Sequence, residues 1–196
     1  TTWWGAAAVG SAMRRYVLTM PAAGAAPAPP PLIVAFHGWS SSPARLERQS
    51  ALGREGAARG FAVLMPEGSG SPARWALPGR LRGGDDVAFV RDLLVDLERA
   101  GCADPGRVYG AGFSNGAAFV AQLSCELPSA FRVVALVAGA GLARPCPSAP
   151  AVPVLLVKDA GDPVIRTGGG TALGGRLQVV GFAEAVAGWR ARNGGA

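Results

Sequence analysis

Residues 107–126 read RVYGAGFSNGAAFVAQLSCE, and this segment carries the strongest structural signal in the chain. The short apolar run at 107–111 indicates a buried strand, and the residues from Ala117 to Glu126 have a helical composition. Between them lies Gly-Phe-Ser-Asn-Gly, a Gly-x-Ser-x-Gly pattern whose glycines permit a sharp strand-to-helix turn. The pattern predicts a nucleophile elbow that exposes the hydroxyl of Ser114; the alternative is a plain strand-to-helix turn.

The segments on either side of this elbow alternate between strand and helix patterns. Alternation of this kind predicts one α/β domain over residues 1–196, in which a mostly parallel, doubly wound sheet lies between two layers of helices. A proline-rich connector at 21–31 joins the first two strands. The predicted strands are 16–20, 32–36, 61–66, 107–111, 131–137 and 152–157, and the predicted helices are 43–59, one beginning near 86, 117–126 and 182–192.

Composition limits the classes of function. The chain has 196 residues, of which 49% are hydrophobic, enough for a substantial core. No apolar run approaches the roughly 18 residues of a membrane span, so we expect no membrane partner. The net charge of +6 comes mostly from arginines that are scattered singly, a pattern that argues against nucleic-acid binding. No leader segment is recognisable, and we expect any leader to be absent or already removed. Nothing in the sequence indicates an oligomeric state.

The three cysteines are Cys102, Cys125 and Cys146. An odd number leaves at least one thiol unpaired if a disulfide forms within this chain, and its partner could lie beyond Ala196. The alternative is that all three are small buried residues in a reducing compartment.

A nucleophilic serine needs a base to accept its proton, yet the sequence contains a single histidine, His37. His37 directly follows the strand at 32–36 and precedes Ser114, whereas an α/β-hydrolase triad runs in the order serine, acid, histidine. We therefore expect His37 to be a structural, hydrogen-bonded residue and the general base to be missing from this chain.

The oxyanion that forms during ester or amide cleavage needs two N–H donors. The backbone N–H of Asn115, at the start of the helix after Ser114, is one candidate. The second should come from the loop after the strand at 32–36, which points to the backbone N–H of Trp39 or, failing that, of Ser40.

An acid is expected in the loop after the strand at 152–157, at the carboxyl end where α/β sheets place their sites. Asp162 is favoured because Pro163 fixes the chain after it, while Asp159 is interpreted as a turn residue. Asp85 and Asp86 are interpreted as helix caps. Trp75 either faces the site, with Ser40 as a second substrate contact, or packs its own loop against the core.

A set of short motifs occurs in a fixed order along the chain: His37-Gly38, Met65 to Gly68, Asp85 to Phe89, Arg107 to Tyr109, Gly112 to Gly116, Cys125 to Pro128, Val137 to Gly139 and Gly161 to Val164. Taken in order, these motifs resemble the secreted polyhydroxybutyrate-depolymerase and feruloyl-esterase-like group of serine esterases, over about residues 16–194. The resemblance implies an α/β-hydrolase fold, a Ser/Asp/His triad and extracellular hydrolysis of small-molecule or polymeric esters without a metal or organic cofactor. It assigns Ser114 as nucleophile, Asp162 as acid, and Trp39 and Asn115 as oxyanion amides.

Three departures from the family pattern affect these assignments. The family's histidine lies in a Gly-Gly-His-like segment well downstream of the helix that contains Trp189, so we expect it beyond Ala196. Lys158-Asp159 stands where relatives usually have His-Gly, and Gly195 stands where many have a cysteine. The second departure puts the detail of the acid loop in question, and the third puts one disulfide in question.

Two classes of function follow. The first is a serine carboxylesterase acting on hydroxyalkanoate polyesters or on feruloyl or acetyl esters of polysaccharides, with a peptidase or lactone hydrolase as a variant on the same fold. The second is a catalytically inactive homologue that binds polymer or carbohydrate through Trp39 and Trp75.

Overall fold

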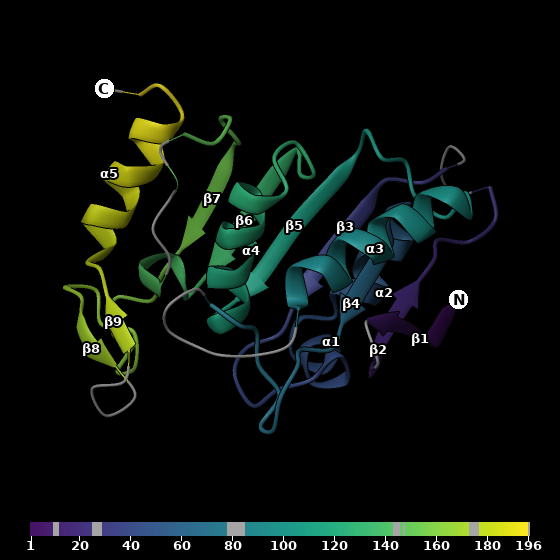
Figure 1. Cartoon of the computed structure of the whole chain (residues 1–196), viewed down its shortest axis with the longest axis horizontal. Helices are drawn as coiled ribbons and strands as arrows, with labels where there is room; N and C mark the ends of the chain where they lie inside the picture. Colours follow the sequence, from purple (N-terminus) through teal and green to yellow (C-terminus); the bar gives the residue numbers. More distant parts are fainter. Residues whose placement is uncertain are drawn as a thin grey trace.

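The computed structural model describes residues 1–9, 12–24, 29–77, 85–142, 146, 148–172 and 177–195. Its centre is a seven-stranded sheet in the order β1-β2-β4-β3-β5-β6-β7 (Figure 1). The pairs β1–β2 and β2–β4 are antiparallel, and all later pairs are parallel. The strands are β1 (Thr2–Val9), β2 (Ala12–Thr19), β3 (Leu32–Phe36), β4 (Ala62–Pro66), β5 (Val108–Phe113), β6 (Val133–Val137) and β7 (Val154–Val157).

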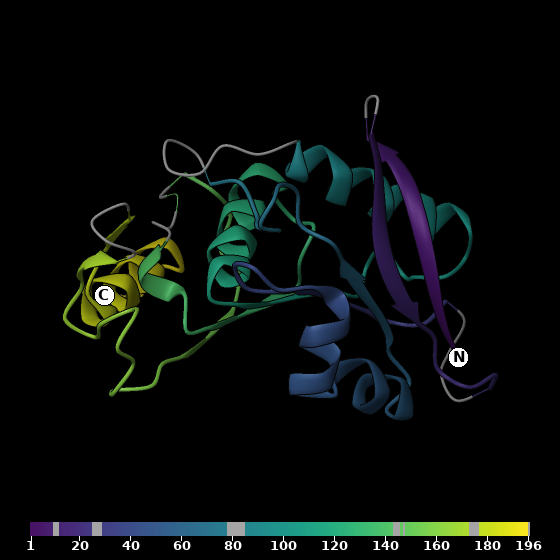
Figure 2. The ribbon, with the colours of Figure 1, turned by 90° about the horizontal axis from the view of Figure 1, so that it is seen from below.

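Helices lie on both faces of this sheet. In Figure 2, α1 (Pro43–Ser50) and α2 (Leu52–Ala58) lie on the face opposite to α3 (Asp86–Arg99) and α4 (Asn115–Glu126). The short helix η1 (Ala140–Leu142), the hairpin of β8 (Gly170–Ala172) and β9 (Leu177–Val179), and α5 (Phe182–Arg192) lie at the β7 end of the sheet (Figure 1). The predicted three-layer arrangement with a mostly parallel sheet is confirmed.

The prediction of one helix over residues 43–59 is wrong, because the chain breaks at Ala51. Ala51 has a left-handed backbone, with φ 53°, and separates α1 from α2. The carboxylate of Glu47 accepts hydrogen bonds from the N–H groups of Gly53 (2.6 Å) and Arg54 (3.1 Å). A glutamate of the first helix thus satisfies two of the free N–H groups at the start of the second, which makes the break favourable.

Strand β1 was not predicted, because its run of tryptophan, glycine and alanine lacks the alternation of a half-buried strand. It pairs with β2 along its whole length, from Thr2 opposite Thr19 to Val9 opposite Ala12. Pairing with the next strand therefore determines the structure of a segment whose own sequence pattern is weak.

An aromatic cluster lies beneath the carboxyl ends of the central strands. The ring of Trp75 stacks on Phe119 of α4, with ring centres 4.8 Å apart, and the edge of Phe36 of β3 meets both rings. All three side chains are fully buried. They pack the loop after β4 against the sheet and against α4, the helix that begins directly after Ser114.

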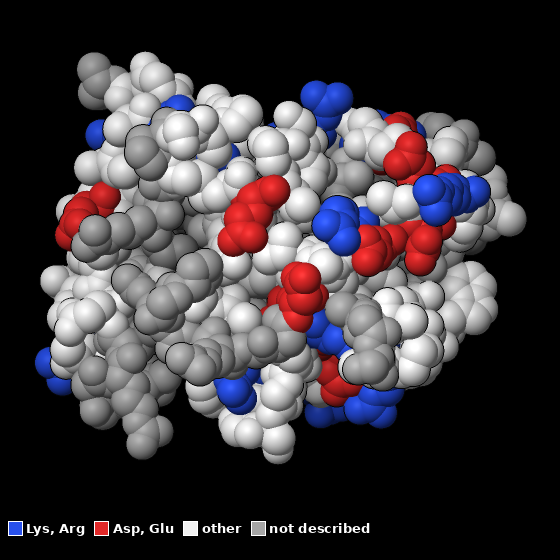
Figure 3. Space-filling model, in the orientation of Figure 1, with Lys and Arg blue, Asp and Glu red and all other residues white. Residues whose placement is uncertain are grey.

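The charged side chains do not form a block of one sign on the face that carries α3 and α4. Figure 3 shows basic and acidic atoms interspersed there. Within the described ranges, no helix is both long and apolar enough to cross a lipid bilayer.

Candidate active site

The residue at the elbow, Ser114, has φ 53° and ψ −117°, a conformation that is strained for a side chain with a Cβ atom. It lies between the last residue of β5 and the first of α4, and its N–H donates to the carbonyl oxygen of Val137 (2.8 Å). The two flanking glycines are sterically required. A Cβ at Gly112 would overlap the backbone of Gly116, and a Cβ at Gly116 would overlap the carbonyl oxygens of Phe36 and His37. The turn therefore has the geometry of a nucleophile elbow.

The loop after β3 approaches the elbow from the side. A Cβ placed on Gly38 would lie 3.5 Å from the Cβ of Ser114. In this loop the N–H of Ser40 donates to the carbonyl oxygen of Ala73 (2.8 Å), whereas no described residue accepts the N–H of Trp39. This difference favours Trp39 over Ser40 as an oxyanion donor.

The second candidate donor, the backbone N–H of Asn115, begins α4 and likewise has no acceptor among the described residues. Its side chain is occupied elsewhere: Oδ1 accepts from the N–H of Trp75 (2.8 Å), and Nδ2 donates to the carbonyl oxygen of Trp75 (3.2 Å). The buried side chain thus holds the neighbouring loop, while the backbone amide stays available at a helix N-terminus, where the potential is positive.

The only histidine of the chain is fully buried and engaged at both ring nitrogens. The Nε2 of His37 accepts from the N–H of Gly68 (2.9 Å), so Nδ1 carries the proton and donates to the carbonyl oxygen of Gly38 (2.8 Å). Burial lowers the pKa of His37, and the hydrogen bond to Gly38 and the nearby carboxylate of Glu67 offset this only in part. His37 therefore joins the loop after β3 to the loop after β4, and it has no free nitrogen for Ser114.

The predicted acid, Asp162, lies in the loop after β7 with both carboxylate oxygens occupied. Oδ1 accepts from the N–H groups of Val164 and Ile165 (2.9 Å each), and Oδ2 pairs with the ammonium of Lys158 (3.1 Å). Burial raises the pKa of Asp162, but the two N–H donors and Lys158 outweigh it, so the pKa is lowered. The carboxylate of Asp159 accepts from the N–H of Gly161 (2.8 Å), which agrees with a turn residue.

Two expectations for aspartates near α3 have different outcomes. Asp85 is the N-cap of α3 and accepts from the N–H of Ala88 (2.9 Å), as predicted. Asp86 is not a cap: it is buried, pairs with Arg14 of β2, and accepts from the N–H of Ala76 (2.7 Å). This buried ion pair fastens the loop after β4 to the sheet.

The expectation that Trp75 contacts substrate is corrected by its burial. Its side chain has no exposed surface, and its indole N–H donates to the carbonyl oxygen of His37 (2.9 Å). Trp75 is therefore hydrogen-bonded to the start of the loop after β3. Trp39, in contrast, is 36% exposed, and the guanidinium of Arg74 lies over its ring.

A cavity of about 380 Å³ opens above Ser114. It brings together Ser114, Asn115, Trp39 and Ser40, and it adds residues that the sequence did not single out. Those of apolar character are Phe113 of β5, Leu142 of η1, and Val164 and Ile165 of the loop after β7, and we call them the apolar wall. Those of polar character, Ser41, Arg45 and Gln49, come from α1 and the residues just before it, and we call them the polar wall; no acidic side chain lines the cavity.

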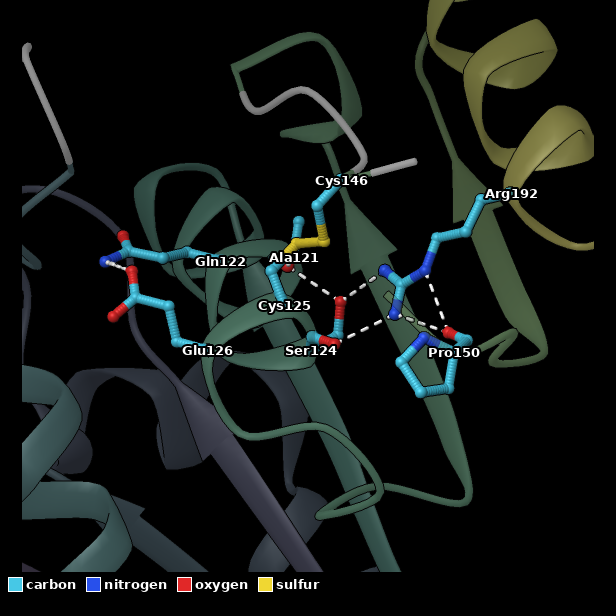
Figure 4. Close-up of a disulfide and its surroundings, with 8 residues drawn as sticks. All are labelled: Ala121, Gln122, Ser124, Cys125, Glu126, Cys146, Pro150 and Arg192. Carbon is cyan, nitrogen blue, oxygen red and sulfur yellow. Dashed lines mark hydrogen bonds between the residues drawn. A yellow bond between two sulfur atoms is a disulfide. The ribbon is translucent and has the colours of Figure 1, made fainter. Parts of the chain in front are cut away.

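Behind the elbow helix, a disulfide joins Cys125 of α4 to Cys146, and Cys102 is a free thiol. Figure 4 shows Arg192 of α5 beside this bond. Its guanidinium donates to the Oγ and the carbonyl oxygen of Ser124 (2.8 Å each) and to the carbonyl oxygen of Pro150 (2.9 and 3.0 Å). The disulfide and the arginine thus hold α4, α5 and the segment before β7 together.

The fold and the elbow place the chain in a structural class, and comparison with known proteins identifies its family. A family profile described as "Esterase PHB depolymerase" matches residues 14–173. The NocK protein of Nocardia uniformis subsp. tsuyamanensis is 36% identical over 154 residues, which cover 74% of this chain and 43% of NocK. Feruloyl esterase B of Piromyces equi is 27% identical over 150 residues, covering 71% of this chain and 27% of that enzyme. The chain therefore spans less than half the length of these relatives.

A solved structure of a thermostable esterase superposes with a TM-score of 0.68 at 16% sequence identity, covering 99% of this chain and 52% of the other. That likeness confirms the α/β-hydrolase fold. The chain belongs to the family described as esterase PHB depolymerase.

Proposed function

We propose that the protein is a serine carboxylic-ester hydrolase that works through a covalent acyl-enzyme. The observation that carries the proposal is the strained Ser114 at the floor of a cavity, next to two backbone N–H groups without an acceptor among the described residues. Membership of an esterase family supports the same class of reaction.

In the proposed reaction, the Oγ of Ser114 attacks the carbonyl carbon of the ester as its proton passes to a base. The negative charge that develops on the carbonyl oxygen is stabilised by the N–H groups of Trp39 and Asn115. Collapse of the tetrahedral intermediate breaks the bond to the alkoxide, which takes the proton from the base. Water then attacks the acyl-enzyme with the same proton relay and releases the carboxylic acid and Ser114.

The base in this proposal is a histidine from outside these 196 residues. Both ring nitrogens of His37 are already hydrogen-bonded to backbone groups, so neither is free to accept the proton of Ser114. Asp162 would accept from the Nδ1–H of that histidine and hold its tautomer. Its Oδ2 is the oxygen for this contact, since Oδ1 already accepts two backbone N–H groups. The incoming imidazole would therefore replace or share the place of Lys158.

The proposed substrates are hydroxyalkanoate polyesters or feruloyl and acetyl esters of polysaccharides, as the names of the family and of a relative suggest. The apolar wall of the cavity suits an acyl group, and the polar wall suits a hydroxyl-bearing part. We also propose that the protein is extracellular, since the Cys125–Cys146 disulfide persists in an oxidising environment.

Hydrolysis of p-nitrophenyl butyrate tests this proposal. The chain extended by its native downstream sequence should show activity that Ser114→Ala lowers by on the order of 10⁴-fold to 10⁶-fold. Ser129→Ala is the matched control, because Ser129 also has a positive φ, 70°, and is exposed outside the cavity. The 196-residue chain alone should be nearly inactive.

Inactivity of every version would leave the other candidate, a polymer- or carbohydrate-binding homologue. Burial of Trp75 removes one of the two aromatic side chains on which that candidate relied. It would then have to bind through Trp39 alone, so the hydrolase is the better supported function.

A further inference from the structure

The polar wall of the cavity contains one charged side chain, Arg45, which comes from the first turn of α1. Ser41, Arg45 and Gln49 are spaced four residues apart, so the same side of this segment presents all three to the cavity. The other charged residues of α1 serve different purposes. Glu47 caps α2, and Arg48 is not part of the cavity wall.

Arg45 has no carboxylate within ion-pair distance among the described residues, which include all acidic side chains of the chain. Its helix positions explain this: the residues three and four positions away are Ser42, Arg48, Ser41 and Gln49, none of them acidic. Some exposed arginines are paired, for example Arg59 with Glu55 (2.7 Å) and Arg15 with Glu67 (2.7 Å), and others, such as Arg48 and Arg166, are in no ion pair with a described residue. Arg45 differs from Arg48 and Arg166 in that it lines the cavity that contains Ser114.

The positive charge of Arg45 is not neutralised by a carboxylate in the cavity. No acidic side chain lines the cavity, and Asp162 of the loop after β7 is paired with Lys158. The guanidinium of Arg74 lies over the ring of Trp39, which lines the same cavity. A neutral substrate would form no ion pair with Arg45, whereas a carboxylate can accept two parallel hydrogen bonds from its guanidinium.

We propose that Arg45 makes the cavity selective for esters that carry a carboxylate a few bonds from the scissile carbonyl group. This inference rests on the proposed function, because it assigns the substrate's charged part to the cavity that contains Ser114. The carboxylate could be the free acid end of an aliphatic ester or the uronate group of a sugar, and the chemistry of recognition is the same.

Binding to the Ser114→Ala chain, followed by NMR titration, tests the proposal without turnover. Monoethyl glutarate is compared with ethyl 4-acetylbutyrate, in which a methyl ketone replaces the carboxylate. A second pair, O-acetylgalacturonate and O-acetylgalactose, identifies a sugar source. In at least one pair the anionic ligand should bind about fivefold more tightly, and 0.5 M salt should reduce this ratio.

The same titrations in three variants assign the ratio to a residue. Arg45→Gln should bring it to about one, Arg45→Glu should bring it below one, and Arg48→Gln, on the same helix, should leave it unchanged. Equal binding of both members of each pair, no binding at all, or a ratio that survives Arg45→Gln would overturn the proposal. Hydrolysis of neutral p-nitrophenyl butyrate reports separately on the proposed function.

Discussion

The loops that follow β5 and β7 lie at the same edge of the sheet, yet they hold their functional groups in opposite ways. After β5 the backbone is strained, and the amides of Asn115 and of the neighbouring Trp39 have no acceptor among the described residues. After β7 the carboxylate of Asp162 is satisfied by two N–H groups and a lysine. In the proposed reaction, the first loop can receive the reacting group as it stands, whereas Asp162 in the second loop must release or share Lys158 before it can accept a histidine.

The largest expected effect concerns the glycines of the two loops. Gly116→Ala should destabilise the fold by about 3–5 kcal/mol or prevent folding, because its Cβ would overlap carbonyl oxygens of Phe36 and His37. Gly161→Ala is the matched change in the second loop, where the nearest atom to the added Cβ is 3.6 Å away. Chemical denaturation should find it within about 0.5 kcal/mol of the parent. Equal losses for both would mean that the elbow is no more constrained than the acid loop.

The Cys125–Cys146 disulfide lies outside both loops but joins the elements that carry them, since it ties the end of the helix after Ser114 to the segment before β7. Replacing both cysteines by serine should lower the free energy of unfolding by about 3 kcal/mol, the loss expected for a closed loop of this size. Cys102→Ser is the control, because this thiol is free. If the double variant keeps its stability, the hydrogen bonds of Arg192 are sufficient to hold α4, α5 and the segment before β7 together.

Removing Lys158 should loosen only the second loop. In Lys158→Met, Oδ2 of Asp162 loses its charged partner, so the pKa of Asp162 should rise and stability at neutral pH should fall by about 1–2 kcal/mol. A ¹³C NMR titration of the carboxyl group measures the first effect. Arg166→Met is the control, because it removes an exposed cation of the same loop that is not bonded to Asp162. An unchanged titration would show that the two N–H groups alone hold the carboxylate.

The difference between the loops also explains what could be predicted. The elbow is a local feature: its glycines, serine and flanking elements are contiguous, so sequence reasoning placed Ser114 and Asn115 directly. The Lys158–Asp162 pair is local too, but charge and spacing alone do not say which of several nearby groups a lysine will meet. Trp75 was ambiguous because an aromatic residue in a loop fits burial and exposure equally well.

Other features depend on contacts between elements that the sequence pattern of one segment does not show. The break at Ala51 depends on the hydrogen bonds that Glu47 accepts from the start of α2, the position of Arg45 in the cavity depends on where α1 packs, and β1 depends on pairing with β2. The family resemblance found in the ordered motifs is confirmed by the matching profile, although the motifs do not determine the shape of the polar wall.

The smallest expected effect is a pH dependence of stability that arises from His37, which links the loop after β3 to the loop after β4. His37 is neutral in the fold, because protonation of Nε2 would break the hydrogen bond from Gly68 in a buried site, and its pKa is lowered. The unfolded chain binds a proton near the ordinary histidine pKa of about 6.5. Stability should therefore be greatest above that pH and decrease as the pH falls toward 5, by at most about 1.4 kcal/mol per pH unit.

His37→Gln provides the comparison, since an amide can still accept from Gly68 and donate to Gly38 but does not titrate in this range. Denaturation between pH 5 and 8 should give a sloping curve for the parent and a flat one for the variant. Asp162 contributes nothing in this window, because its lowered pKa places its titration at more acidic pH. A parent curve that is flat, or that rises toward pH 5, would contradict this prediction. It would show that the loop after β3 accommodates a charged His37, and that this loop is less rigid than its hydrogen bonds indicate.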